Sequence, residues 1–323
     1  MMTPNITKAT HSPHLATIGG FCAILLWSTT VAFARSLSEQ LGPVTAATAV
    51  YGVSSVAALL SLLRHKQRWQ QILQLPLRYL VGCGTLFVGY MLMLFLSIGW
   101  ANSRQQVLEV GLLNYLWPAL TLVLSLVFLG RKASWLLFPG TLFALTGVFL
   151  VLTQGAPVSW QSLSENLSSN PAAYSLGLAA AVFWAMYSNL TRKWVGDQKC
   201  GAVVMFLPLT AIILFITCCF LDEPREWSSR ALTEALFLGV ATYVAYTLWD
   251  LAMRQGNVIM VAAASYLTPL FSTIVSCLYL AVVPGAKLWV GCAVLVIGSV
   301  LSWRSVPNDS QSNKKNETLH KGS

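Results

Sequence analysis

The stretches that decide the fold are Glu109-Val110-Gly111-Leu112-Leu113-Asn114-Tyr115-Leu116-Trp117-Pro118 and, further along, Ser265-Tyr266-Leu267-Thr268-Pro269. Asn114 aligns with Ser265 at an offset of 151 residues, and both stretches lie inside long apolar runs. A proline inside a helix lacks the backbone N–H, so it frees the carbonyl four residues earlier, here that of Asn114 or Ser265. The recurrence predicts two related units, each with an interrupted helix.

The repeat extends well beyond these prolines. The recurring pairs are Gly20 with Gly177, Trp27 with Trp184 and Arg35 with Arg192 at an offset of 157, and Gly140 with Gly291 and Gly147 with Gly298 at an offset of 151. Each unit then holds five helices, and an odd number inverts the second unit in a membrane. Inverted repeats are typical of secondary transporters, with the substrate site between them.

The composition places these units in a lipid bilayer. Of the 323 residues, 56% are apolar and 10% are charged, with a mean hydropathy of +0.65, whereas soluble proteins carry about 25% charged residues. A membrane-spanning helix needs roughly 20 apolar residues. The expected spans are 15–36, 43–63, 78–100, 104–128, 134–152, 172–192, 201–221, 231–253, 257–281 and 287–304. The prediction is an all-α polytopic membrane protein with ten transmembrane helices as two inverted five-helix repeats.

The charged residues predict the orientation. With a cytoplasmic N-terminus, 15 of the 20 Lys and Arg residues lie on the cytoplasmic side, as the positive-inside rule requires. Both termini are therefore expected in the cytoplasm, with the protein in the inner membrane. The expected organisation is a cytoplasmic segment 1–14, a first repeat 15–152, a periplasmic linker 153–171, a second repeat 172–304 and a disordered cytoplasmic tail 305–323.

The first apolar run has a competing interpretation as a cleavable signal peptide, because Lys8 precedes it and Ala32-Phe33-Ala34 resembles a cleavage site. The recurrence of its Gly20 and Trp27 as Gly177 and Trp184 argues against cleavage, since an internal helix of the same design is no signal peptide.

The sequence also argues against several classes of function. A net charge of +9 would suggest nucleic acid for a soluble protein, but here the cations fall in short connecting segments. The seven cysteines form no CxxC pair, and the four histidines lie outside the apolar runs, so we expect neither metal nor cofactor. Because no P-loop, catalytic Ser-His pattern or paired mid-span carboxylates occur, we do not expect an enzyme. A pore or structural membrane protein is an alternative that the inverted repeat disfavours.

Mid-span aromatic and polar residues are the candidates for substrate contact. Buried Trp and Tyr need partners for N–H and O–H groups, and their rings can stack on a flat substrate. The alternative is tight aromatic packing between helices. The candidate substrate-binding residues are Trp27, Tyr90, Glu109, Asn114, Tyr115, Trp117, Trp184, Tyr187, Tyr243, Tyr246 and Tyr266, with helix breaks at Pro118 and Pro269. Trp249 is expected beside the face shared by Tyr243, Tyr246 and Asp250.

Two acidic residues lie within expected spans. Glu109 has Met260 as its repeat partner and could bind a substrate ammonium, carry a coupling proton or pair with Arg104. Asp250 has Arg254 four residues later, which favours a structural ion pair.

Together with Leu26-Trp27-Ser28-Thr29 and Gly256-Asn257-Val258, the two proline stretches resemble the drug/metabolite transporter superfamily, and within it the bacterial aromatic amino acid exporters. The resemblance covers about 15–304. It implies a central cavity between the halves, and efflux of phenylalanine, tyrosine and tryptophan across a Gram-negative inner membrane by alternating access. Other small metabolites, aliphatic amino acids or drugs are the alternative cargo. Proton coupling and passive transport both stay open, and a cavity complete within one chain sets no oligomeric state.

Overall fold

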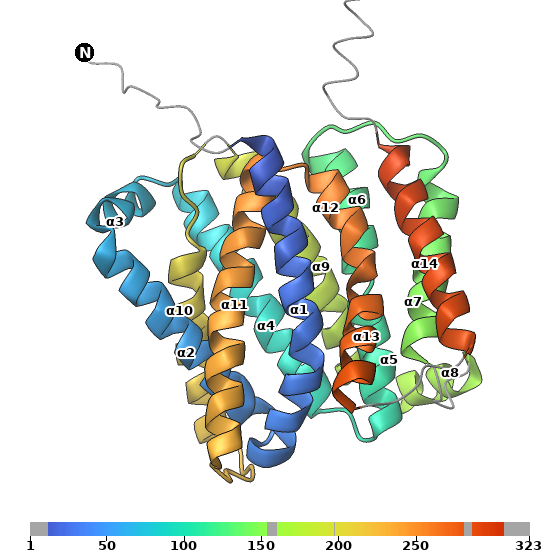
Figure 1. The fold of residues 1–323 in the computed structure, drawn as a ribbon, viewed down its shortest axis with the longest axis horizontal. Coiled ribbons are helices and arrows are strands. Elements are labelled where there is room, and N and C mark those ends of the chain that lie inside the picture. Colours follow the sequence, from blue (N-terminus) through green and yellow to red (C-terminus); the bar gives the residue numbers. More distant parts are fainter. Residues whose placement is uncertain (1–11, 154–159, 197, 281–285, 307–323) are drawn as a thin grey trace, which may run out of the picture.

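The computed structural model describes residues 12–153, 160–196, 198–280 and 286–306, and these residues form helices without strands. Among them, four helices are long and apolar enough to cross a membrane, and further shorter apolar helices accompany them. The expected all-helical class is confirmed. The helices run side by side along one bundle, with the start of α1 and the end of α14 at the same end (Figure 1).

The helix bounds are α1 Pro13–Leu41, α2 Pro43–Arg64, α3 Lys66–Leu73, η1 Tyr79–Cys83, α4 Gly84–Gly99, α5 Arg104–Asn114, α6 Trp117–Phe128, α7 Leu137–Leu152, α8 Trp160–Ser169, α9 Pro171–Val195, α10 Val203–Cys219, α11 Ser229–Gln255, α12 Val258–Ala264, η2 Ser265–Leu267, α13 Thr268–Leu280 and α14 Ala286–Ser305. Here η1 is a short π-helix that leads directly into α4, and η2 is a 3₁₀ turn between α12 and α13.

Both proline segments contain a helix interruption immediately before the proline. α5 ends at Asn114 and α6 begins at Trp117, while η2 separates α12 from α13. Pro118 is thereby in the first turn of α6, where a backbone N–H would have no partner within the helix, so the missing N–H of proline costs nothing. The Ser265 carbonyl accepts a hydrogen bond from the Thr268 hydroxyl at 2.7 Å, so this carbonyl is satisfied locally.

Glycines mark where helices of one half cross helices of the other. A Cβ added to Gly20 of α1 would lie 2.7 Å from the Val261 side chain of α12. A Cβ added to Gly177 of α9 would lie 2.9 Å from the Val110 side chain of α5. Gly177 follows Gly20 by 157 residues and Val261 follows Val110 by 151, so the two crossings use corresponding residues.

The peripheral pair α7 and α14 repeats this arrangement on the right of Figure 1. Gly147 lies against the Leu295 backbone, where an added Cβ would come within 2.4 Å of its nitrogen. Gly298 lies against the Ala144 backbone, at 2.1 Å by the same measure. Both crossings are too close for any side chain, so these glycines set the separation of α7 and α14.

Two helices lie where the sequence suggested connecting segments. α3 forms over Lys66–Leu73, and α8 forms over Trp160–Ser169 inside the segment interpreted as a linker. The α8 sequence holds four serines and one asparagine, which are weak helix formers. Ser162 and Asn166 of α8 donate hydrogen bonds to the buried Glu109 carboxylate, and this tertiary contact outweighs the weak propensity.

Candidate functional site: a buried aromatic cluster

Aromatic side chains from both halves meet in the middle of the bundle. We call the following set the aromatic cluster: Trp27 of α1, Phe87 and Tyr90 of α4, Trp117 of α6, Trp184 and Tyr187 of α9, and Tyr246 and Trp249 of α11. Neighbouring rings have centroids between 4.8 and 6.5 Å apart, which is direct contact. These rings occupy the middle of the bundle, where the resemblance implied a central cavity.

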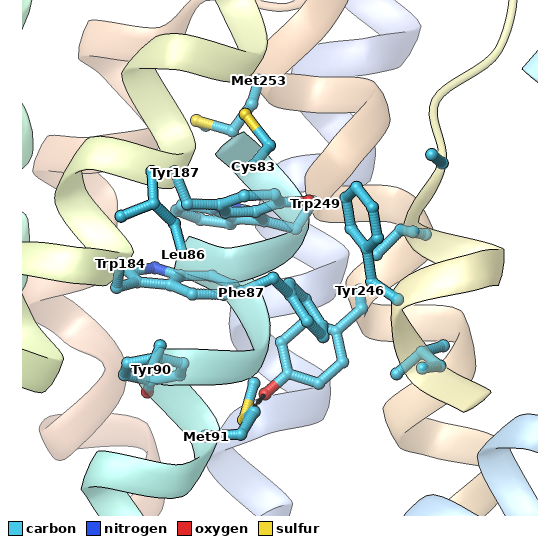
Figure 2. Close-up of a cluster of buried hydrophobic side chains, with 14 of the residues drawn as sticks. Cys83, Leu86, Phe87, Tyr90, Met91, Trp184, Tyr187, Tyr246, Trp249 and Met253 are labelled. Atoms are coloured by element: carbon cyan, nitrogen blue, oxygen red, sulfur yellow. Dashed lines mark hydrogen bonds between the residues drawn. The ribbon is translucent and has the colours of Figure 1, made fainter. Parts of the chain in front are cut away.

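Trp184 lies at the centre of this cluster and is 2% exposed. Its ring is 4.8 Å from Tyr90, 5.6 Å from Trp27 and 5.8 Å from Trp249, centroid to centroid. Figure 2 shows Trp184 between Tyr90 and Trp249. Each such aromatic pair contributes about 0.5–1.5 kcal/mol beyond the burial of its area.

Helical spacing explains how three helices present two rings each to the same space. Phe87 and Tyr90, Trp184 and Tyr187, and Tyr246 and Trp249 are all i, i+3 pairs. Residues three apart share a helix face, so each pair forms a two-ring patch.

Several polar atoms in and beside the aromatic cluster are buried without a hydrogen-bond partner. They are Trp27 Nε1, the Tyr187 hydroxyl, Asn114 Oδ1 and Asn189 Oδ1. The rest of the Asn189 amide is engaged, because Nδ2 donates to the Thr121 and Ala185 carbonyls at 3.0 and 2.9 Å. A buried unpaired donor or acceptor costs about 1–3 kcal/mol. Two of these atoms, Trp27 Nε1 and the Tyr187 hydroxyl, are donors, and the two amide oxygens are acceptors.

Other polar groups in the cluster are satisfied by the protein itself. Trp249 Nε1 donates to the Ser188 hydroxyl at 3.3 Å, and the Tyr51 and Tyr246 hydroxyls lie 3.1 Å apart. The unpaired atoms therefore stand out against a background of paired ones.

The remaining sequence candidates lie elsewhere. Tyr115 and Tyr266 pack in a second core with α7 and α14. Tyr243 is partly buried at the edge of the first core and lines a pocket of about 360 Å³ with Arg64 and His65. Trp249, expected to one side, is instead 0% exposed and inside the cluster, because its i, i+3 relation to Tyr246 decides the face.

Glu109 is fully buried near the end of the bundle that carries α8. Its carboxylate accepts hydrogen bonds from Gln105 Nε2 at 3.1 Å, from Asn166 Nδ2 at 3.1 Å, from Ser162 and from the Tyr174 hydroxyl. We call this set the Glu109 network. The donors among the described side chains are neutral, and they tie α5 to α8 and α9. Arg104, the other partner considered, has a side chain outside the described residues.

A second buried carboxylate lies toward the opposite end. Asp250 accepts from Arg254 Nε at 2.8 Å and from the Tyr79 hydroxyl at 3.3 Å, so the expected i, i+4 ion pair is present. The Tyr79 hydroxyl also accepts from the Ala202 backbone N–H at 3.0 Å. Gly201 packs so closely on the carboxylate that any Cβ there would overlap it. We call this set the Asp250 network.

The Asp250 network and the Glu109 network lie toward opposite ends of the bundle. The long apolar helices and the buried cluster of rings among them define a multi-pass helical membrane protein. Glu109, Glu234 and Asp250 are buried carboxylates within it. Among the described residues, no group of three or more His, Cys, Asp or Glu side chains could hold a metal ion.

Comparison with known proteins gives the family. The profile of the EamA-like transporter family matches residues 14–153 and again residues 171–304, so this chain belongs to that family. It is 35% identical to the aromatic amino acid exporter YddG of Salmonella typhimurium and 33% identical to that of Escherichia coli K12, over 89% of this chain and 96% of each relative. The exporter of the same name from Ancylobacter novellus is 31% identical over the same shares. A crystal structure matches with a TM-score of 0.75 and 27% identity, covering 90% of this chain and 98% of its own.

Proposed function

We propose that this protein is an inner-membrane secondary transporter that exports phenylalanine, tyrosine and tryptophan by alternating access. The observation that carries the proposal is the aromatic cluster with its unpaired Trp27 Nε1 and Tyr187 hydroxyl. The names of the relatives, which are aromatic amino acid exporters, support the same substrate class.

The proposed architecture is ten spans in two inverted repeats, with both termini in the cytoplasm. In it, α5 with α6 and α12 with α13 each count as one broken span. The corresponding glycine crossings, Gly20 on Val261 and Gly177 on Val110, support a pseudo-twofold axis between the halves. The two separate family matches support the repeat boundaries.

The substrate's ring would take the place of contacts that the cluster now makes with itself. An aromatic side chain can stack between Trp184 and Trp249 or between Trp184 and Tyr90, the pairs already in contact. Its carboxylate would accept from Trp27 Nε1 and the Tyr187 hydroxyl, and its ammonium would donate to the amide oxygens of Asn114 and Asn189. A zwitterion is net neutral, so neutral dipoles suffice to bind it.

A closed cluster requires motion during transport. Because the rings touch, a substrate enters only when the halves separate on one side of the cluster. The Asp250 network lies toward one end and the Glu109 network toward the other, so opening toward either side weakens one set of hydrogen bonds at a time. This arrangement supports alternating access, in which two states exchange around one central site.

Glu109 is the proposed site of proton coupling. The carboxylate is fully buried and accepts hydrogen bonds from neutral groups among the described side chains, an environment that a conformational change can alter. Glu109→Gln should remove the pH dependence of transport and leave substrate binding in place. Transport by the variant with the same pH dependence as the wild type would rule out this role.

A flux assay tests the transport proposal. The purified protein is reconstituted into liposomes, and uptake of radiolabelled phenylalanine and threonine is compared with and without a proton gradient. Phenylalanine-selective flux is expected, and its response to the gradient separates coupled from passive transport. Equal flux of both amino acids, or none from folded protein, would assign the fold to another metabolite or drug.

A further inference from the structure

An open basic pocket lies at the end of the bundle where α2 meets α3 and where α10 begins. Its volume is about 670 Å³. Besides Arg254, four cationic side chains line it, from Arg64, Lys66, Arg68 and Lys199. Among the described residues of its lining, Asp250 is the one carboxylate, and Arg254 already pairs with it at 2.8 Å. The pocket therefore keeps an excess of positive charge.

The rest of the wall combines polar side chains, such as Gln67, Gln71 and Thr247, with an aliphatic part. Leu63 of α2, Ile72 of α3, Val204 of α10 and Leu251 of α11 contribute aliphatic surface between the cations. A free inorganic anion gains nothing from such a wall, whereas a molecule with an anionic head and an apolar body can use both parts. The wall thus suits an anionic amphiphile.

The transported substrate fits this pocket poorly. An amino acid zwitterion brings an ammonium group together with its carboxylate, and the ammonium would face four cations at short range. The one nearby carboxylate is occupied by Arg254 and Tyr79. A ligand with a net negative charge is favoured over a zwitterion on electrostatic grounds.

The location indicates where that ligand comes from. The pocket lies at the ends of long apolar helices, and the Trp69 side chain of α3 is exposed beside the basic residues of the same helix. Tryptophan and basic residues at helix ends are typical of the membrane–water interface. Basic pockets between membrane helices at this depth recognise anionic lipid headgroups.

We propose that this pocket binds the headgroup of an acidic phospholipid. Its phosphate lies among Arg64, Lys66 and Lys199, and its glycerol and upper acyl chains lie against the aliphatic wall. The site does not depend on which solute the protein transports, so a failed flux assay leaves it untouched.

Lipid binding by the full-length protein tests the proposal. Native mass spectrometry of the protein in neutral detergent measures binding of phosphatidylglycerol and, for comparison, of phosphatidylcholine. The pocket variant is Arg64→Gln with Lys66→Gln. The matched control is Lys132→Gln with Arg304→Gln, which removes two exposed cations outside the pocket lining at the same end of the bundle.

The expected result is saturable binding of phosphatidylglycerol that the pocket variant weakens by about 30-fold, from on the order of 1 kcal/mol for each cation lost. The control should bind as the wild type does. Equal weakening in both variants would mean diffuse surface attraction and would overturn the proposal. Inorganic phosphate that protects the wild type against thermal unfolding as well as phosphatidylglycerol does would replace the lipid with a soluble anion. Because all four substituted side chains are exposed, each variant is expected to fold, which its melting curve verifies.

Discussion

At the scale of single residues, the Tyr187 hydroxyl separates a binding role from a packing role. This hydroxyl is buried and unpaired, so Tyr187→Phe removes a group that the empty protein leaves unsatisfied. The melting temperature should stay the same or rise, because an unpaired buried hydroxyl is itself a cost. If the hydroxyl binds the substrate carboxylate, KM for phenylalanine should rise about 10-fold, the effect of losing roughly 1.5 kcal/mol from one hydrogen bond to a charged group.

The matched control is Tyr51→Phe, which deletes a hydroxyl that already contacts the Tyr246 hydroxyl at 3.1 Å. We expect this variant to lower the stability by about 1 kcal/mol, with a smaller effect on KM. A Tyr187→Phe variant that is less stable and has an unchanged KM would assign that hydroxyl to folding alone.

At the scale of helices, the glycines between α7 and α14 make a quantitative prediction. Gly147→Ala would place a methyl group within 2.5 Å of the Leu295 backbone, so the two helices must move apart. Overpacking of this kind typically costs about 1–3 kcal/mol.

Gly52→Ala in α2 is the control, since nothing lies within 4 Å of the added carbon, and alanine there should stabilise the helix by about 0.5–1 kcal/mol. Thermal unfolding in detergent should move in opposite directions for the two variants. Equal shifts would mean that the α7–α14 contact is loose.

The same scale explains what the sequence could and could not predict of the fold. Bilayer thickness sets the length of an apolar run, so the expected span 43–63 agrees with α2 at Pro43–Arg64 to within one residue. The sequence could not predict α8, because this polar segment is helical through contacts with Glu109, which lies over 50 residues earlier. A hydropathy pattern contains no information about such a distant partner.

The candidate site, too, was predicted from the sequence only in part. The internal repeat alone singled out Trp27 and Trp184, which meet at 5.6 Å. A mid-span position does not reveal which face of a helix a ring occupies. The sequence therefore did not predict that Tyr266 lies in the second core and Trp249 in the first. Helix spacing from Tyr246 was the feature that could have identified Trp249.

At the scale of the whole molecule, two tyrosines predict opposite shifts of one equilibrium. The Tyr79 hydroxyl holds Asp250 toward one end of the aromatic cluster, and the Tyr174 hydroxyl holds Glu109 toward the other. Cys83 lies one turn beyond Tyr79 on the cluster side and is 0% exposed, so its thiol reports opening at the Asp250 end (Figure 2). With the other cysteines replaced by alanine, Tyr79→Phe should speed maleimide labelling of Cys83. Tyr174→Phe should slow it by stabilising the state open at the opposite end. Each change is expected to be on the order of 10-fold, because one hydrogen bond to a carboxylate is lost.

The two variants delete the same atom type, so each serves as the other's control. Faster labelling in both would mean general loosening of the bundle, and would contradict two-state exchange around a shared central site.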